Sequence, residues 1–481
     1  MNPQRTVLRG GHVITMDDTI GDLPVGDVLI EDRSIAAIGP SIDAADAIVV
    51  DARGAVVMPG LVDTHRHTWQ TQMRGICADW TLNDYFLGMR LAISPAYTAE
   101  DVYIGNYLGA VEALRSGVTT ILDFSHCNNT PDHADAAVRG LQDAGIRALH
   151  CYGFFAPSRG TTDFPTHETR LADFERVLRR YGTSDGLVTI GSALTEVATI
   201  PWAATVMEVE ATRRLDARMV LHTGCQWGSV MTMGVREMDA HGLLAGDQVH
   251  VHCNTLDESE WKMLARAGAR VSISPETELN MGMGRPMVAE CLRHRIHPTL
   301  SCDIISLNSG DLFTQMRLAI ATARFGDNDT IHRSGAMPEK LSVTSKEALR
   351  WATLYGAEAC GLDDRIGSLR PGKQADIIVL GGADSMAFRP CVEPAGSVVF
   401  QATAHDVRDV FVAGKAVKKD GVLLGVDVPA LMGRAEESAA RILAGIRRST
   451  PDFPSRAGQR ASYDAFEKLA KQNLAGAWPP A

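Results

Sequence analysis

Two histidines follow a short apolar run near the start of the chain and could bind a metal ion. His65 and His67 come after the run Met58-Pro59-Gly60-Leu61-Val62-Asp63, with Thr64 between. Side chains two residues apart on a strand point to the same side, so both imidazoles can face one point. Imidazole suits divalent ions such as zinc, iron or nickel, and this spacing therefore indicates half of a metal site.

Three more polar residues end later apolar runs. His222 closes the run 219–221, His252 closes 249–251 and Asp303 closes 300–302. His65, His67, His222 and Asp303 together offer three nitrogens and a carboxylate and leave one position for water. A metal ion lowers the pKa of bound water towards about 7, and a nearby carboxylate can accept the proton of that water. We therefore expect one divalent metal ion, zinc with iron as the alternative, and attack on an electron-poor carbon.

The run 249–252 leaves one choice open. His250 and His252 lie two residues apart and share a face of the predicted strand. Either imidazole could polarise the substrate group opposite the metal, and spacing does not choose between them.

The elements that must position these residues alternate between apolar runs and amphipathic helices. Thr98 and Asp257 are expected to cap two of the helices, and Gly268 to end the second one. Eight strands in such a pattern predict a (β/α)₈ barrel, whose active site forms at the carboxyl ends of its strands. An open doubly wound sheet is the alternative, but no GxGxxG follows the first strand. The predicted strands are 60–65, 118–123, 148–152, 188–192, 219–222, 249–252, 271–274 and 299–303.

Short β segments flank the predicted barrel on both sides and suggest one small β-sandwich built from both ends of the chain. We expect residues 1–57 and 361–430 to form this domain, 58–360 the catalytic barrel and 431–481 a helical tail. The flanking strands are predicted at 6–8, 12–16, 28–31, 34–38, 48–51, 375–380, 398–401, 407–412 and 415–417.

Composition excludes several classes of protein. The 481 residues carry 47 Lys and Arg against 58 Asp and Glu, a net charge of −11, which argues against nucleic acid as a partner. No run of 18 apolar residues is present, so no membrane span is expected. Nine cysteines without a CxxC spacing are typical of reduced thiols in a cytoplasmic protein. The charge balance does not indicate which small molecule is the substrate.

The motifs in combination resemble the amidohydrolase superfamily. The phrases that carry the resemblance are MPGLVDTHRH, LH at the fifth strand, HC at the sixth, the Asp that ends the eighth, and IGSLRPGKQADIIVL near the end. The similarity is strongest to cytosine, guanine and adenosine-type deaminases and to triazine hydrolases. It implies that His65, His67, His222 and Asp303 hold one metal ion, that Asp303 accepts a proton from water and that His252 contacts the substrate. It also implies a homo-oligomer.

One position departs from that pattern. The deaminase-like members carry a Glu three residues after the fifth-strand His, where it donates a proton to the ring and the leaving group. Here Cys225 stands three residues after His222, and Gln226 comes next. A Gln side chain cannot act as a general acid at neutral pH. Deamination by that proton shuttle is therefore in question.

Two glutamates near the seventh strand could replace the missing one. The segment reads Ser274-Pro275-Glu276-Thr277-Glu278, where related chains more often show a Cys-Pro-x-Ser-Asn-like phrase. We expect Glu276 to be the acid and Glu278 to contact the substrate. The alternative is a solvated loop whose glutamate pairs with Arg285.

Further contacts to the substrate are expected from the first and second loops of the barrel mouth. We predict Gln72, Trp80 and His126 as substrate-binding residues, while Asp311 is better placed to cap a helix. The sequence thus indicates a metal-dependent hydrolase that cleaves a carbon–nitrogen bond of a small, cyclic substrate. The alternatives are a chlorohydrolase or lyase-like enzyme that does not need the missing Glu, and a metal-binding barrel that has lost activity.

Overall fold

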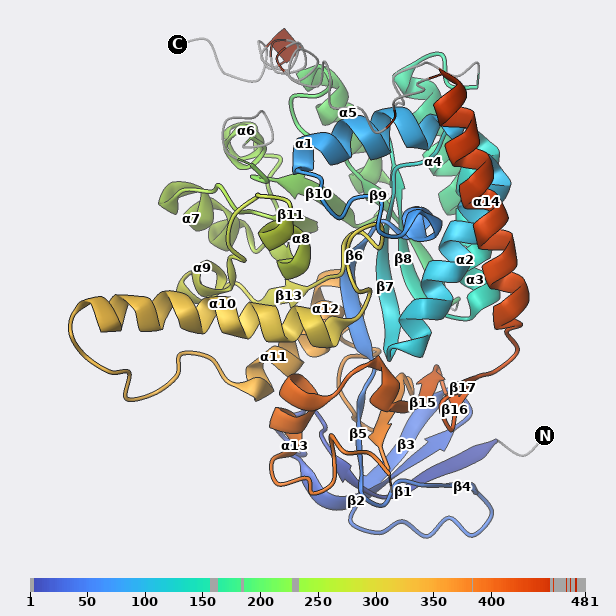
Figure 1. The fold of residues 1–481 in the computed structure, drawn as a ribbon, viewed down its shortest axis with the longest axis vertical. Coiled ribbons are helices and arrows are strands. Elements are labelled where there is room, and N and C mark those ends of the chain that lie inside the picture. Colours follow the sequence, from blue (N-terminus) through green and yellow to red (C-terminus); the bar gives the residue numbers. More distant parts are fainter. Residues whose placement is uncertain are drawn as a thin grey trace.

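The chain folds around two sheets, an eight-stranded parallel barrel and a mixed sheet beneath it (Figure 1). The computed structural model describes residues 4–155, 163–182, 186–226, 233–382 and 384–449, together with 453, 464, 468, 472 and 473.

The barrel confirms the eight predicted strands. Neighbouring strands pair in parallel from β6 to β13, and a bridge between Arg66 and Asp303 joins the two ends of the sheet. The middle residue of the HRH motif thus helps to close the barrel. The strands are β6 (Leu61–Arg66), β7 (Val118–Ser125), β8 (Arg147–Gly153), β9 (Val188–Ala193), β10 (Met219–Thr223), β11 (Gln248–His252), β12 (Arg270–Ile273) and β13 (Pro298–Leu300).

Two helices of the barrel begin at the predicted caps, and one ends at the predicted glycine. Thr98 accepts a hydrogen bond from the Asp101 amide, and Asp257 accepts from the Ser259 amide at 2.8 Å. Gly268 ends its helix at φ 69°, a left-handed conformation that favours glycine. The helices are α1 (Leu82–Tyr85), α2 (Ala99–Arg115), α3 (Pro131–Ala144), α4 (His167–Tyr181), α5 (Trp202–Arg214), α6 (Val235–Ala240), α7 (Glu258–Ala267), α8 (Pro275–Asn280), α9 (Val288–Arg293), α10 (Leu312–Arg333), α11 (Ser345–Trp351), α12 (Leu354–Cys360), α13 (Pro394–Gly396) and α14 (Val428–Ser449).

The mixed sheet combines both ends of the chain, as expected. Its order is β17-β16-β15-β14-β5-β1-β2-β3, with β4 paired to β1. The predicted strand at 398–401 is wrong, because Ser397–Gln401 continues the helical turn that Glu393 caps. The strands are β1 (Arg5–Val13), β2 (Leu23–Glu31), β3 (Ser34–Gly39), β4 (Ile48–Asp51), β5 (Ala55–Pro59), β14 (Ile377–Gly381), β15 (Val407–Val412), β16 (Lys415–Lys419) and β17 (Val422–Leu423).

The mixed sheet packs against the end of the barrel where the strands begin. Arg147, the first residue of β8, donates from Nε to Asp376 Oδ2 at 2.8 Å, and both side chains are buried. The Gly60 amide donates to the Asp376 carbonyl just before β6 begins. These contacts leave the carboxyl ends of the barrel strands on the opposite side of the barrel.

The tail helix α14 packs along α2 of the same chain (Figure 1). Ser438 donates to Asp101 at 2.6 Å, and Ile442 and Ile446 join a buried cluster with Trp80 and Met89. The predicted tail is therefore helical as far as Ser449. The rest of it, apart from a few single residues, lies outside the described residues.

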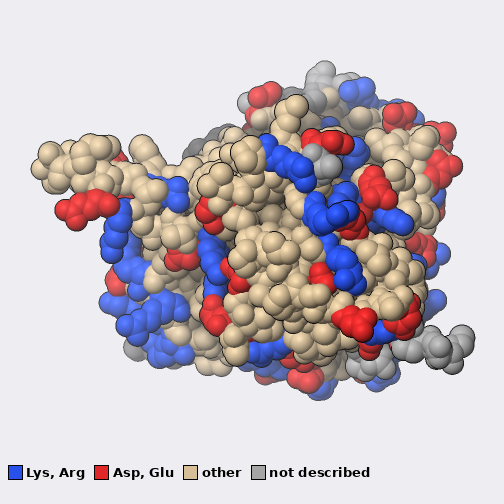
Figure 2. Space-filling view, turned by 90° about the horizontal axis from the view of Figure 1, so that it is seen from below, with Lys and Arg blue, Asp and Glu red and all other residues tan. Residues whose placement is uncertain are grey.

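The surface below the mixed sheet carries both signs of charge. Figure 2 shows Lys and Arg interspersed with Asp and Glu on this face. Among the described residues, no helix is both long and apolar enough to cross a membrane.

Candidate active site

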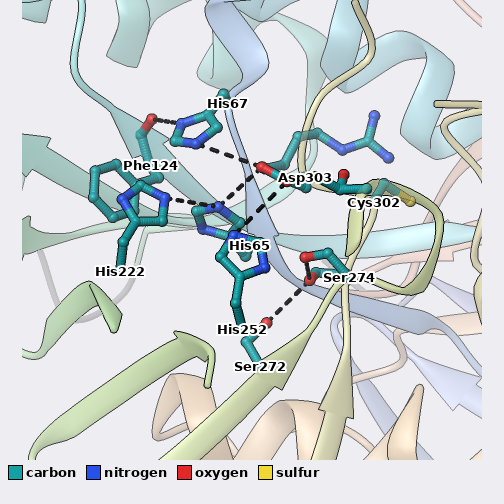
Figure 3. A network of polar contacts seen from close by, with 12 residues as sticks. His65, His67, Phe124, His222, His252, Ser272, Ser274, Cys302 and Asp303 are labelled. Carbon is teal, nitrogen blue, oxygen red and sulfur yellow. Dashed lines mark hydrogen bonds and ion pairs between the residues drawn. The ribbon is translucent and has the colours of Figure 1, made fainter. Parts of the chain in front are cut away.

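Four histidines and one aspartate converge at the carboxyl ends of the barrel strands (Figure 3). His65 and His67 extend from β6 and its end, and both are almost completely buried. The Nδ1 atom of His67 lies 2.9 Å from the carbonyl oxygen of Phe124. That contact places the ring proton on Nδ1 and leaves the Nε2 lone pair of His67 facing the centre of the cluster.

His222 enters the cluster from β10 in the same way. Its Nδ1 lies 2.9 Å from Oε1 of Glu196, and its Nε2 lies 3.3 Å from Nε2 of His65. A carboxylate on Nδ1 fixes the ring orientation and leaves Nε2 free to bind a metal ion.

Asp303 completes the cluster just beyond β13. Its Oδ1 lies 3.1 Å from Nε2 of His65 and 3.5 Å from Nε2 of His67. The residue adopts φ 57°, a left-handed conformation that aspartate tolerates better than most residues. Two backbone hydrogen bonds, with the His65 carbonyl and the His67 amide, hold this conformation in place.

These donors fit a single divalent cation. One ring nitrogen each of His65, His67 and His222 lie within 4.8 Å of one another, and a second such group joins His65 and Asp303 to His252. His67 and His222 each hold their proton on the outer nitrogen, so the inner nitrogens meet lone pair to lone pair. A cation between them would make this arrangement favourable, and imidazole nitrogen and carboxylate oxygen are ligand types found in catalytic metal sites.

The pKa values within the cluster support neutral imidazoles around an ionised carboxylate. Burial lowers the pKa of His65 to about 4 and places that of His67 well below its usual value. Burial on its own would raise the pKa of Asp303, but hydrogen bonding and charge from His65 outweigh it and lower the pKa. Neutral imidazoles and an ionised carboxylate are the protonation states that bind a metal ion.

His252 takes the position opposite Asp303, and His250 does not. The Nε2 atom of His252 lies 3.9 Å from Oδ2 of Asp303, while its Nδ1 lies 3.2 Å from Oε1 of Glu278. His250 lies deeper in the barrel, with Nδ1 3.0 Å from the Thr223 hydroxyl. The strand leaves its regular conformation at His252, where φ is 77°.

The two glutamates after β12 point in different directions. They lie on the short helix α8, where residues two apart are separated by about 200° around the axis. Glu278 is fully buried beside His252. Glu276 instead accepts from Gln315 Nε2 at 2.6 Å and from the Ser309 hydroxyl at 2.9 Å. The structure therefore brings Glu278, and not Glu276, to the cluster.

Of the other predicted substrate-binding residues, His126 lies at the cluster, whereas Gln72 and Trp80 do not. His126 stacks on His67 with ring centroids 4.2 Å apart, and Trp69 donates to its Nδ1 at 3.1 Å. Its buried Nε2 has no hydrogen-bond partner among the described residues. Gln72 instead donates to the Asp101 carbonyl and to Ser438, at the junction of α2 and α14. Trp80 is buried in the apolar cluster beneath α14.

Sequence reasoning missed the ion pair that supports His222. Glu196 follows β9, and its carboxylate accepts from Arg90 Nη1 as well as contacting His222. The guanidinium group of Arg90 also stacks 3.9 Å from the centre of the Phe155 ring. Burial would raise the pKa of Glu196, but Arg90 and His222 lower it. Glu196 does follow a predicted strand, which was a usable signal, whereas no motif marks Arg90.

This arrangement can hydrolyse a bond at an electron-poor carbon. Asp303 can accept a proton. His252, at the end of β11, faces it with Nε2 3.9 Å from Oδ2 of Asp303. His126 offers an unpartnered N–H group at the edge of the cluster. Barrel enzymes place their chemistry at this end of the strands.

Comparison with known proteins agrees with this geometry. The chain is 28% identical over 451 residues to a 5'-deoxyadenosine deaminase of Methanosarcina barkeri, covering 91% of this chain and 98% of the relative. It is 29% identical over 460 residues to a 5-methylthioadenosine/S-adenosylhomocysteine deaminase of Symbiobacterium thermophilum, covering 92% and 99%. A zinc-bound adenosine deaminase of Xanthomonas campestris superposes with a TM-score of 0.80 at 25% identity, covering 92% and 99%.

The same relationship appears at the level of the family. Residues 56–417, most of the chain, match the amidohydrolase family. The relatives named above are deaminases, which hydrolyse carbon–nitrogen bonds. The barrel, the converging histidines and this match agree: the chain belongs to the amidohydrolase family and is a hydrolase of carbon–nitrogen bonds.

Proposed function

We propose that this chain is a zinc-dependent deaminase that replaces the 6-amino group of an adenosine-type nucleoside with oxygen. The observation that carries the proposal is the convergence of His65, His67, His222 and Asp303 on one point in a chain whose full-length relatives are named adenosine-derivative deaminases. Three nitrogens and a carboxylate suit zinc, with iron as the alternative.

The cation, when bound, supplies Lewis acidity that lowers the pKa of a water to about 7. Asp303 accepts the proton of the attacking water, because its carboxylate is ionised and faces the cluster. His252, held at Nδ1 by Glu278, keeps its Nε2 directed towards the same space and orients the water against the ring carbon.

His126 is suited to bind the substrate. The hydrogen bond from Trp69 makes Nδ1 an acceptor, so the proton of the neutral ring is on Nε2. Burial lowers the pKa of His126 well below its usual value, which keeps the ring neutral. An N–H group buried without a partner is costly unless a ligand pairs with it, and an acceptor nitrogen or hydroxyl of a nucleoside would do so.

The test uses purified protein, its metal content and a panel of aminated compounds. We expect about one equivalent of zinc per chain, and release of ammonia from adenosine or 5'-deoxyadenosine. Cytosine and guanine serve as further substrates, and 6-chloropurine riboside tests the chlorohydrolase alternative by release of chloride. Ammonia from no 6-aminopurine nucleoside would contradict the proposal, and no hydrolysis at all by the metal-loaded protein would favour a barrel that has lost activity.

Two other expectations stay predictions. The homo-oligomer is tested by light scattering of the purified protein. The cytoplasmic location is tested by fractionation of the source cells.

A further inference from the structure

Hydrolysis of an amidine-type carbon–nitrogen bond needs a group that gives a proton and takes one back. When oxygen adds to the ring carbon, an electron pair moves onto the adjacent ring nitrogen, and that nitrogen must be protonated. Asp303 already accepts the proton of the attacking water, so a second titratable side chain is required. The proposed deaminase therefore needs another acid within reach of the substrate.

Most carboxylates near the cluster are already committed. Glu196 is paired with Arg90 and His222. Burial acts to raise the pKa of Glu196, but these two partners outweigh burial and lower it. Glu276 accepts from Ser309 and Gln315 outside the cluster. Glu196 is therefore held in its ionised form, and Glu276 does not contact the histidines of the cluster.

Glu278 has the properties that the others lack. Its side chain is completely buried, and Oε1 is held by the Ser274 amide at 2.8 Å and by His252. The other oxygen, Oε2, has no hydrogen-bond partner among the described residues. No Lys or Arg within the described ranges forms an ion pair with it, and burial raises its pKa. A buried carboxyl group with one unpaired oxygen is suited to carry a proton.

Glu278 also adjoins the position from which a glutamate is missing. Cys225 stands three residues after His222, and burial together with the charges of Glu196, Asp303 and Glu278 raises the pKa of its thiol. Glu278 in turn occupies the place of Asn in the Cys-Pro-x-Ser-Asn-like phrase. One carboxylate is absent at the end of β10, and another is present on α8 beside the same space.

We propose that Glu278 is the catalytic acid and base that serves the ring nitrogen of the substrate, an inference that rests on the proposed deaminase function. Glu278 begins protonated and gives its proton to the ring nitrogen while the carbon–oxygen bond forms and Asp303 takes a proton from water. The carbon–nitrogen bond to the amino group then breaks, and the proton on Asp303 leaves with ammonia. The new hydroxyl returns its proton to Glu278 as the carbonyl forms, so both carboxyl groups regain their starting states.

The test compares two variants that separate proton transfer from positioning of His252. Glu278→Gln keeps an amide oxygen that can accept from His252 Nδ1 but cannot give a proton, whereas Glu278→Ala removes both functions. We expect both to lower kcat about 10²–10⁴-fold and to retain the wild-type metal content. If the Gln variant keeps at least a third of the wild-type kcat, the proposal is overturned. Glu260→Gln, another buried glutamate that lies on α7, is the matched control.

A second variant keeps the proposal testable if those proteins fold poorly. In Cys225→Glu/Glu278→Asn the carboxylate moves to the position that the related deaminases use. We expect its kcat to be within about tenfold of the wild type, whereas a double variant as slow as Glu278→Gln overturns the proposal. A wild-type protein that releases no ammonia from any 6-aminopurine nucleoside instead refutes the deaminase function, and the role of Glu278 with it.

Discussion

Two histidine–carboxylate pairs lie side by side at the barrel mouth and differ in one partner. His222 contacts Glu196 at 2.9 Å, and His252 contacts Glu278 at 3.2 Å. All four side chains are buried. Glu196 also binds Arg90, while Glu278 has no cationic partner among the described residues other than the histidine itself.

That one partner reverses the direction of the pKa shift. Burial raises the pKa of both carboxyl groups, but Arg90 outweighs it at Glu196 and nothing comparable does so at Glu278. An ionised Glu196 can only accept from His222 and so orients a residue that we propose as a metal ligand. A protonated Glu278 can give its proton away. A histidine–glutamate contact thus supports different chemistry depending on whether a cation such as Arg90 also binds the glutamate.

The largest expected effect distinguishes His222 from His252. His222→Ala removes a proposed metal ligand, so we expect loss of bound metal and activity below detection. His252→Ala removes a group that faces Asp303, so we expect near-normal metal content and a kcat lower by about 10²–10⁴-fold. Elemental analysis and steady-state kinetics check both results. Equal loss of metal in the two variants would show that His252 is a ligand as well.

The next effect tests Arg90 as the residue that distinguishes the pairs. Arg90→Met leaves Glu196 buried without its cation, and breaking a buried ion pair in this way costs about 3–5 kcal/mol of unfolding free energy. Urea unfolding measures the change. Arg333→Met, which breaks the exposed pair with Asp329, is the control and should cost no more than about 1 kcal/mol. Similar values for both variants would contradict a special role for Arg90.

Glu196→Gln should have a smaller effect, confined to the metal. An amide orients His222 less strongly than a carboxylate, and we expect a loss of about 10–100-fold in metal affinity. Competition with a chelator measures the affinity, and excess zinc should restore most of the activity. Glu208→Gln is the control, since burial raises the pKa of Glu208 to about 8 and its carboxyl group contacts Thr195 rather than a histidine of the cluster. An unchanged affinity in Glu196→Gln would remove the distinction between the pairs.

The smallest effect concerns His250, the second histidine of β11. Burial lowers its pKa from 6.5 to about 3, so the folded chain keeps it neutral while the unfolded chain protonates it below pH 6.5. Its contribution to stability is complete above pH 6.5 and is lost as the pH falls towards 3. Between pH 6.5 and 5.5 the wild type should lose about 1 kcal/mol more unfolding free energy than His250→Asn. Parallel pH dependences would refute this assignment.

Much of the architecture could be predicted because it depends on local patterns. The eight barrel strands, the caps at Thr98 and Asp257 and the capping role of Asp311 follow from apolar runs and from residues next to them. The strand predicted at 398–401 is wrong, because a local pattern can also fit two structures. A run of apolar residues fits either a strand or a buried helical turn, and the cap at Glu393 decided for the turn.

Most of the site could be predicted because its residues lie at or just beyond the ends of strands, whereas Glu278 was predicted from the segment after β12. The residues at strand ends are His65, His67, His222, His252 and Asp303, and the structure gathers them at one point. Gln72 and Trp80 follow β6 in the sequence but pack against α2 and α14 instead of the cluster. The helix α14 comes from the far end of the chain, so local spacing could not reveal this packing. Arg90 lies 106 residues from Glu196, and nothing in the spacing links them.

The sequence by itself determined the barrel, the small composite β domain and the histidines and aspartate at the strand ends, because periodicity and strand ends are local properties. Only the tertiary structure decided which carboxylates contact the histidines of the cluster. Glu276 and Glu278 are separated by about 200° on α8, so only one can face His252, and the helix rather than the spacing makes that choice. The charge of each carboxylate then depends on a partner brought from elsewhere in the chain, Arg90 for Glu196 and none in the described structure for Glu278.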